Sequence, residues 1–353
     1  MNVLNGEPFL KYQLASIYPF ADEIIIVEGA YQKFAHAADP KGHSTDGTVE
    51  ALKKFADPEG KIKLIQKDGF YPDRLEMCNE FFSLATGDVL WQVDVDEFYK
   101  PETHRLVRRK FEELPTLDRI SFRVEEYFFS TAYVVCGAAY ASGLSDVRRV
   151  FRLQEGDRWA DQRPPTLAGV NGEPRTVRDE ILAADMAREG HIIHHPTVLF
   201  EQQFRDKYLY YQKMWSSITQ DKEWIDLTWK CIYNPLNILG IEPYCSWLDR
   251  REGRLPIELD MLENDAQSGN ISGFNIRDNR DIDDYLKKDF SKEDARTGEM
   301  LNSVLKNSDL FSLRTWMSVF VCVSYCVKWG GSAKGVYVRK GLWVAIRRIF
   351  SKI

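Results

Sequence analysis

The sequence predicts an α/β protein in which helices flank a mixed, mostly parallel central sheet. Over the first hundred residues, short apolar runs alternate with segments of helical periodicity, which is the pattern of parallel βαβ units. After Ile120, apolar residues recur at every second position, which predicts antiparallel strands added to the sheet. With 353 residues, 44% of them hydrophobic, the chain can fill one large domain with appendages or two domains.

Four apolar runs predict the first strands, and helical segments separate them. In chain order we expect a strand ending at Leu4, a helix over 8–18, a strand over 23–28, a helix from Ser44 or Thr45 to about residue 55, a strand over 61–66, a helix over 73–84 and a strand over 88–93. Open α/β sheets bind ligands at the carboxyl ends of their strands. Glu28 and Asp94 stand at two such ends, so we expect both at the same rim.

The remainder of the chain is predicted to mix strands and helices and to end in a helical extension. The expected elements are antiparallel strands within 120–140 and over 147–153, a strand over 192–195, a helix from 200 to about 219, an acidic linker within 260–299 and a helix over 341–353. Aromatic residues at helical spacing in 200–219 are assigned to core packing. The uncharged stretch 315–327 is shorter than the roughly 18 to 20 residues that span a bilayer.

Charge is distributed unevenly along the chain. The net charge is −6, yet residues 310–353 contain eight Lys or Arg and no acidic residue. An acidic main domain argues against nucleic acid as a partner. The helix over 341–353 has an apolar and a basic face, which suits either an anionic membrane surface or docking on the domain with the basic face in solvent. The six cysteines lack metal-ligand spacing and no signal sequence is visible, so we expect a cytoplasmic protein, peripheral on the inner face of the membrane under the first alternative.

Asp94-Val95-Asp96-Glu97 is the strongest candidate site. It follows an apolar strand that Ala85-Thr86-Gly87-Asp88 introduces. Carboxylates gathered at a strand end are costly to bury without a cation or hydrogen bonds, and hard oxygen ligands suit Mg²⁺ or Mn²⁺. The sequence therefore predicts a divalent-cation site, and the alternative is that these acids cap the following segment and face water.

The first hundred residues resemble glycosyltransferase family 2, which has the Rossmann-like GT-A fold. The resemblance rests on motifs in the family's order, namely Asn5-Gly6-Glu7, Glu28-Gly29-Ala30, Ser44-Thr45-Asp46-Gly47-Thr48, Arg74 with Asn79, Ala85-Thr86-Gly87-Asp88 and Asp94-Val95-Asp96. It becomes weaker from residue 100 to about 215. It implies a hexosyltransferase-type enzyme that moves a sugar from a nucleoside diphosphate sugar to an acceptor hydroxyl, with inversion and with Mn²⁺ or Mg²⁺ as cofactor. The implied acceptor is a glycan or a lipid-linked molecule, in glycan or cell-surface polysaccharide synthesis.

Three features depart from the family's pattern. Glu28 stands where the family has aspartate, and the 13 residues Tyr31–His43 separate the Glu28 motif from Ser44, where the family's motif is continuous. We expect this insertion to reshape the pocket for the base. The first strand also begins almost at Met1, so we expect it to be shorter than in the family. A sequence that starts too late, or a trimmed sheet edge, would explain this.

The resemblance implies further ligand contacts. Asn5 and Glu7 would border the nucleotide, and Glu28 would accept hydrogen bonds from the base or ribose. Asp46 would lie near the same pocket, with helix capping as the alternative. Arg74 would contact the base or the diphosphate, with a surface salt bridge as the alternative.

A histidine and a general base are expected to complete the site. Strand alternation sends His194 and His195 to opposite faces, and the resemblance favours His194 as a metal ligand beside Asp94 and Asp96. The alternative is an imidazole packed against backbone. Asp161, close to Trp159, is the preferred catalytic base for an inverting transfer. The other candidates for the base are Glu155, Asp157, Asp179 and Glu180. The alternative for Asp161 is that it is a solvated acid in a loop, with no catalytic role.

The predicted organisation has three parts. Residues 1–220 form the GT-A domain, with a nucleotide-binding half over about 1–100 and an acceptor half over 101–220; residues 221–300 form a helical or irregular extension with the acidic linker, and residues 301–353 form the basic amphipathic segment. Two other functions are possible in principle. A sugar-nucleotide pyrophosphorylase would open with a Gly-rich, basic loop, which residues 3–8 lack. A non-catalytic, transferase-like module tethered to a membrane is the other alternative, and the presence of both Asp94 and Asp96 argues against it.

Overall fold

The computed structural model describes residues 1–137, 146–214, 222–231, 238–239 and 246–287, and these residues divide between two units. The first unit consists of residues 1–125, 146–196 and 253–273, and the second contains the described residues of 126–145, 197–252 and 274–353. The predicted basic segment over 301–353, with its helix over 341–353, lies outside the described residues. Within the described part of the chain, no helix is both long and apolar enough to cross a membrane.

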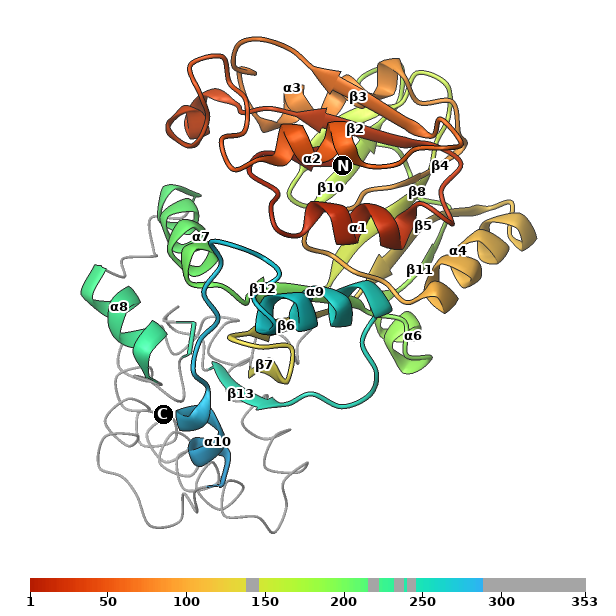
Figure 1. Ribbon diagram of the computed structural model, residues 1–353. Coiled ribbons are helices and arrows are strands. Elements are labelled where there is room, and N and C mark those ends of the chain that lie inside the picture. The colour runs from red at the N-terminus through yellow and green to blue at the C-terminus, as the bar shows by residue number, and fades with distance from the viewer. Residues whose placement is uncertain (138–145, 215–221, 232–237, 240–245, 288–353) are drawn as a thin grey trace, which may run out of the picture. The chain divides into compact units, whose positions relative to one another are not determined.

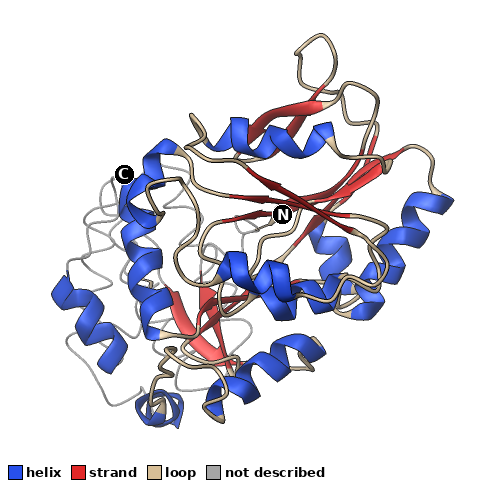
Figure 2. Ribbon diagram, turned by 45° about the horizontal axis from the view of Figure 1, so that its top comes forward, coloured by secondary structure: helices blue, strands red, loops and turns tan. Residues whose placement is uncertain are grey.

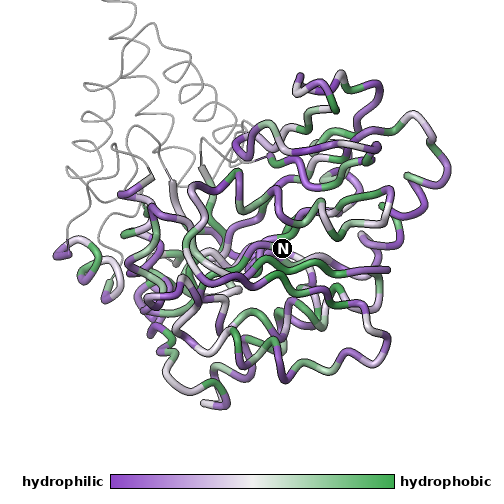
Figure 3. The backbone as a smooth tube through the Cα atoms, turned by 90° about the horizontal axis from the view of Figure 1, so that it is seen from above, coloured by the Kyte–Doolittle hydropathy of each residue, from purple (hydrophilic) through white to green (hydrophobic). Residues whose placement is uncertain are grey.

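A parallel sheet begins the first unit (Figure 1). Its strands, in the order β1-β2-β3, are β1 (Asn2–Val3), β2 (Ile24–Glu28) and β3 (Ile62–Gln66), and helices α1 (Leu10–Ile17) and α2 (Thr48–Lys54) lie between them in sequence. The register sets Val3 beside Glu28 and Glu28 beside Gln66, so the carboxyl ends of the three strands meet at one edge. Apolar side chains of both helices pack with Ile26 of β2, and apolar colour follows the strands beside the N-terminus in Figure 3.

A second sheet in this unit is mixed. Its strands, in the order β11-β5-β8-β4, are β4 (Val89–Trp91), β5 (Leu117–Phe122), β8 (Val147–Arg152) and β11 (Asp179–Ile181). Strand β8 runs antiparallel to both of its neighbours, whereas β11 runs parallel to β5. Helix α4 (Pro101–Glu113) begins with a proline, which suits the first helical position. Its Leu106 and Phe111 pack with Ile120 of β5.

The prediction that the strands form one mostly parallel sheet is therefore wrong. The run over 88–93 does form a strand, but β4 pairs with the antiparallel β8 and not with the β1-β2-β3 sheet. The period-two run over 147–152 supplies this partner, since every backbone N–H and C=O of a buried strand needs one. A cavity of about 380 Å³ lies along β4, and Met1 and Asn2 form part of its wall.

Shorter elements surround the two sheets, and Figure 2 shows helices on either side of the strands. They are η1 (Gln32–Ala37), α3 (Arg74–Asn79), η2 (Glu80–Ser83), the antiparallel hairpin of β9 (Arg158–Gln162) and β10 (Pro165–Ala168), α6 (Ala183–Arg188) and α9 (Ile257–Gln267). Trp159 of the hairpin packs edge-on against Phe151. Helix α9 lies beside α1, where the Tyr12 hydroxyl donates to Asp265 at 2.6 Å. Residues 253–273, expected in the extension and linker, thus belong to the first unit.

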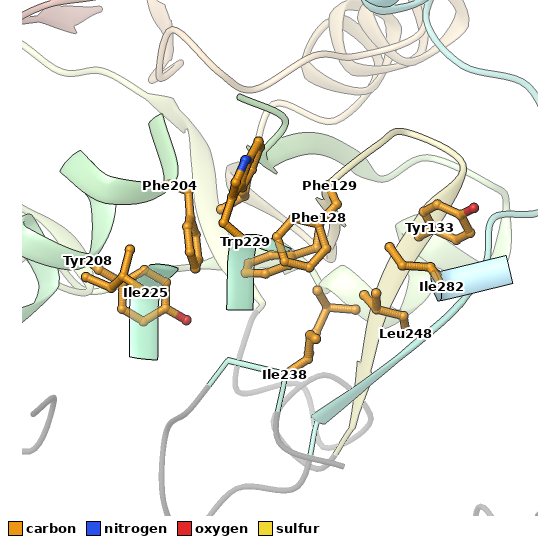
Figure 4. Close-up of a cluster of buried hydrophobic side chains, with 12 residues drawn as sticks. Phe128, Phe129, Tyr133, Phe204, Tyr208, Ile225, Trp229, Ile238, Leu248 and Ile282 are labelled. Atoms are coloured by element: carbon orange, nitrogen blue, oxygen red, sulfur yellow. The ribbon is translucent and has the colours of Figure 1, made fainter. Parts of the chain in front are cut away.

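An aromatic cluster forms the core of the second unit (Figure 4). The remaining described elements are β6 (Val124–Phe128), β7 (Tyr133–Gly137), β12 (Ile193–Val198), α7 (Glu201–Met214), α8 (Lys222–Lys230), β13 (Ser246–Arg250) and α10 (Arg280–Lys287), with the sheet order β12-β6-β7-β13. Phe204 and Tyr208 of α7 are buried in this cluster with Trp229 of α8. Their assignment to packing is confirmed, whereas Trp215 of the predicted helix lies outside the described residues.

Candidate active site

Asp94 and Asp96 lie just beyond the carboxyl end of β4, and each carboxylate already has a partner. Asp94 Oδ2 lies 3.2 Å from Arg149 Nη2, and Asp96 Oδ2 lies 3.1 Å from His195 Nε2. The side chain of Asp94 is 36% exposed and that of Asp96 is 19% exposed. A ligand can therefore reach both carboxylates, but it must exchange with partners from β8 and β12.

Glu97 and Arg149 form a buried ion pair beneath the two aspartates. The guanidinium donates from Nε to Glu97 Oε2 at 2.8 Å and from Nη2 to Glu97 Oε1 at 2.5 Å. Burial raises the pKa of Glu97, and the attraction of Arg149 opposes that rise. Burial by itself would lower the pKa of Arg149, but the Glu97 and Asp94 carboxylates together hold it above its ordinary value. The two-point contact ties Arg149 of β8 to the residue that follows Asp96.

The two adjacent histidines point to different surroundings. His195 reaches Asp96, whereas the His194 side chain is buried with Nδ1 3.8 Å from Glu125 Oε1. The cause is the backbone pairing of His194 with Phe98, which exchanges two hydrogen bonds of 2.9 Å and fixes which face each side chain takes. The structure thus sets His195, rather than the predicted His194, beside the Asp94-Val95-Asp96 triplet.

The donor types at this rim suit a hard divalent cation. Two carboxylates and one imidazole are ligands that Mn²⁺ and Mg²⁺ sites use. Among the described residues, however, no three His, Cys, Asp or Glu side chains are already grouped so that they could hold a metal ion. The chemistry of Asp94, Asp96 and His195 fits a cation, and their present arrangement satisfies them with one another and with Arg149.

The loop after β1 packs against the same triplet. A Cβ added to Gly6 would lie 2.6 Å from Val3 Cγ2 and 3.2 Å from Val95 Cγ2, so only glycine lets the loop approach so closely. Asn5 has a left-handed backbone, with φ of 55°, and its Oδ1 accepts from Thr45 N at 2.8 Å. The loop that carries the predicted nucleotide contacts is thereby brought to Val95.

Asp46 links this loop to the start of α2. One carboxylate oxygen accepts from Glu7 N at 2.9 Å, and the other accepts from Thr48 N at 3.0 Å. Gly47 between them has φ of 98°, a conformation that glycine adopts without strain. The N-cap residue of α2 is Gly47, so Asp46 precedes the cap, and its bond to Thr48 N is a local turn contact that holds the chain at the helix start. Burial, and then the neighbouring Asp46 charge, raise the pKa of Glu7.

Glu28 is fully buried at the end of β2, and both of its carboxylate oxygens are in use. Oε1 accepts from Ser44 N at 2.8 Å, while Oε2 accepts from Gln66 Nε2 and lies near His43 Nδ1, each at 2.9 Å. His43 Nε2 lies 3.0 Å from Asp68, whose hydrogen bond, followed by that of Glu28, raises the pKa of His43. Glu28 thus holds the end of the Tyr31–His43 insertion against the sheet, and its expected contact with the base stays a prediction.

Arg74 and Asn79 lie at the two ends of α3. Asp73 caps this helix by accepting from Glu76 N at 2.9 Å. The Arg74 side chain forms a hydrogen bond with Cys78 one turn later. Asn79 bonds both backbone groups of Trp159, with Trp159 N donating to Asn79 Oδ1 at 2.8 Å. Asn79 therefore fastens the β9–β10 hairpin to α3, and the nucleotide contact of Arg74 stays a prediction.

Asp161 lies on the exposed face of β9. Its Oδ1 accepts from Gln162 N at 2.6 Å and from Arg163 N at 2.9 Å, which stabilises the hairpin turn. Gln162 points the opposite way and accepts from Gln92 Nε2 at 3.0 Å, next to the end of β4. The hairpin thus brings Gln162, which sequence reasoning did not single out, to the rim, and the role of Asp161 as base stays a prediction. Among the other candidates, Asp157 pairs with Arg175 and Glu180 with Arg119, while Glu155 and Asp179 are exposed.

Sequence reasoning included Glu97 in the candidate site but missed Arg149, its partner. The available signal was an arginine within the apolar strand Val147-Arg148-Arg149-Val150, where an unpaired charge would be costly to bury. Its partner becomes evident only from the pairing of β4 with β8, in which Gln92 N donates to Arg149 O at 2.8 Å.

Comparison with known proteins identifies the region that contains this site. The family model for glycosyl transferase family 2 matches residues 41–163, which include α2, the Asp94-Val95-Asp96 triplet, Arg149 and Asp161. The resemblance predicted from the motifs is confirmed. No curated protein matches the chain.

Proposed function

We propose that this chain moves a sugar from a nucleoside diphosphate sugar to an acceptor hydroxyl, because residues 41–163 match the family model of glycosyl transferase family 2. The observation that supports the proposal is the position of Asp94 and Asp96. Both follow the carboxyl end of β4, the edge strand of the mixed sheet, and Val95 between them packs beside the loop that carries Asn5 and Glu7. Strand ends of this kind are where α/β sheets bind nucleotides.

Each demand of the reaction corresponds to groups at this rim. A bound Mn²⁺ or Mg²⁺ would supply positive charge that balances the departing diphosphate. Asp94, Asp96 and His195 are the residues that would hold it, and Arg149 and Glu97 keep the two aspartates in position. We retain Asp161 as the candidate that accepts the proton of the acceptor hydroxyl in an inverting transfer.

We further propose a glycan or lipid-linked acceptor and a hexosyl donor. The basic residues in 310–353 would bring a cytoplasmic enzyme to an anionic membrane surface where such acceptors are found. Replacing Arg347, Arg348 and Lys352 with glutamine should weaken co-sedimentation of the full chain with vesicles that contain anionic lipid. Equal binding by the parent protein and the variant would contradict the membrane proposal.

Donor hydrolysis with and without Mn²⁺ tests the assigned reaction. The purified chain should release nucleoside diphosphate from one of a panel of uridine and guanosine diphosphate sugars, and chelation of the metal should stop it. Asp96→Asn should remove most of this activity and leave the melting temperature without metal nearly unchanged, because asparagine keeps the shape of the side chain and an oxygen that faces His195. Asp88→Asn is the matched control, since Asp88 lies at the opposite end of β4 and its side chain is 85% exposed.

Three results would separate the alternatives. Turnover by Asp96→Asn at the parent rate would contradict the role of Asp96. Nucleoside diphosphate binding with no product, at any divalent ion, would favour the non-catalytic binding module. Formation of a nucleoside diphosphate sugar from a sugar phosphate and a nucleoside triphosphate would favour the pyrophosphorylase.

A further inference from the structure

We propose that Arg149 is a positioning residue that acts as the built-in counter-charge of Asp94 and competes with a divalent cation for its carboxylate. The inference rests on the proposed function, because it concerns the same rim. It assigns to Arg149, which lies outside the Asp94-Val95-Asp96 triplet, an influence on how tightly this rim binds a cation.

The backbone holds Arg149 in a fixed place. It lies in β8, where its backbone oxygen accepts from Gln92 N just after β4, and its side chain is 10% exposed. A guanidinium keeps its charge throughout the pH range in which proteins are folded. Arg149 therefore presents a permanent positive charge next to the end of β4.

The hydrogen bonds of the guanidinium are shared unequally between two carboxylates. Glu97 binds both Nε and Nη2 in a two-point contact, with its side chain only 4% exposed. Asp94 shares Nη2 at 3.2 Å, and its side chain is 36% exposed. Two-point pairs between arginine and carboxylate are the stronger ones. Glu97 is thus the fixed partner of Arg149, and Asp94 is the partner that an incoming ligand can take.

The charges at the rim support an exchange of this kind. Arg149 balances the charge of Glu97, which leaves Asp94 and Asp96 as two negative charges near solvent. Two carboxylates match the charge of one divalent cation. As long as Nη2 stays on Asp94, part of that charge is already compensated, so the cation must compete with the guanidinium.

Mn²⁺ titration without nucleotide, followed by electron paramagnetic resonance, tests the inference with two variants. In Glu97→Gln the guanidinium loses its charged partner and turns more strongly to Asp94, so Mn²⁺ binding should weaken at least threefold. In Glu97→Gln with Arg149→Met a neutral pair replaces the ion pair and Asp94 is released. This double variant should bind Mn²⁺ at least tenfold more tightly than Glu97→Gln alone.

A second ion pair in the same unit provides the matched control. Asp157 and Arg175 are also buried, with side chains 2% and 13% exposed. Asp157→Asn with Arg175→Met should leave the Mn²⁺ affinity unchanged. Equal Mn²⁺ affinities in the parent, Glu97→Gln and the double variant, all folded by circular dichroism, would overturn the inference and leave Arg149 as a structural partner of Glu97 alone.

A metal-free measurement distinguishes this inference from the proposed function. If the parent protein binds no Mn²⁺, cation binding at the rim is wrong, and the contact of Arg149 with Asp94 is still open to test. A double-mutant cycle of Arg149→Met and Asp94→Asn, in the Glu97→Gln background with chelator present, should show that the two stability losses are not additive. Additive losses would contradict the contact itself.

Discussion

Replacing Arg149 with methionine should destabilise the first unit strongly, because it leaves the Glu97 charge buried without a partner. The Glu97 side chain is 4% exposed and loses its hydrogen bonds to the guanidinium in this variant. Removing one partner of a buried ion pair typically costs about 3–5 kcal/mol. We therefore expect a loss of that size in the free energy of unfolding at pH 7, measured by urea unfolding with tryptophan fluorescence.

Two comparisons make this prediction specific. Adding Glu97→Gln to Arg149→Met should recover most of the loss, since a neutral pair of similar volume carries no buried charge. The loss in free energy of unfolding caused by Arg149→Met alone should also be smaller at pH 5 than at pH 7. Burial already raises the pKa of Glu97, and protonation at the lower pH removes its unpaired charge. A loss below about 1 kcal/mol, or a double variant no more stable than the single one, would refute this interpretation of the pair.

Three further predictions concern single residues of the first unit. Asp46→Ala should lower the free energy of unfolding by about 1 kcal/mol, because Glu7 N and Thr48 N lose the carboxylate that accepts their hydrogen bonds; no measurable loss would contradict the role of Asp46 in linking the loop to α2. Asp68 and then Glu28 raise the pKa of His43, so protonation of this histidine should stabilise the fold. The stabilisation should be complete below about pH 6.5 and should disappear as the pH rises through the raised pKa of His43. His43→Gln should abolish this pH dependence of the free energy of unfolding. Burial lowers the pKa of His104 to about 4, so stability should fall by about 3 kcal/mol between pH 6.5 and pH 4, and His104→Leu should remove this slope.

Local sequence pattern was sufficient for features that depend on a few neighbouring residues. The apolar run before Asp94 predicts a strand, and the aspartates do follow one. The Ser-Thr-Asp-Gly sequence predicts a helix start, and Asp46 does accept from Thr48 N there. In both cases the determining interactions lie within one strand or one helical turn.

Features set by long-range pairing could not be predicted in the same way. Whether His194 or His195 faces Asp96 depends on the backbone bridge between His194 and Phe98, which are far apart in sequence. The partner of Arg149 depends on β4 joining an antiparallel neighbour rather than the parallel sheet. Such contacts follow from register and sheet order, which periodicity alone does not specify.

The Tyr31–His43 insertion shows a further limit. Its length predicted a reshaped base pocket, but its contacts could not be read from the sequence. In the structure its last residue, His43, bonds with Glu28 and Asp68, so the carboxylate expected to border the nucleotide also holds the insertion. A buried carboxylate accepts bonds from whatever donors the fold brings near, and here the insertion brings them.

The most direct test of the cation site is anomalous diffraction at the manganese edge from a crystal soaked with Mn²⁺ and a nucleoside diphosphate. We predict a single strong peak in contact with carboxylate oxygens of both Asp94 and Asp96, with the diphosphate bound on its other side. A nucleotide bound elsewhere, or no peak at this rim while Asp94 stays on Arg149 and Asp96 on His195, would contradict the proposed role of the two aspartates.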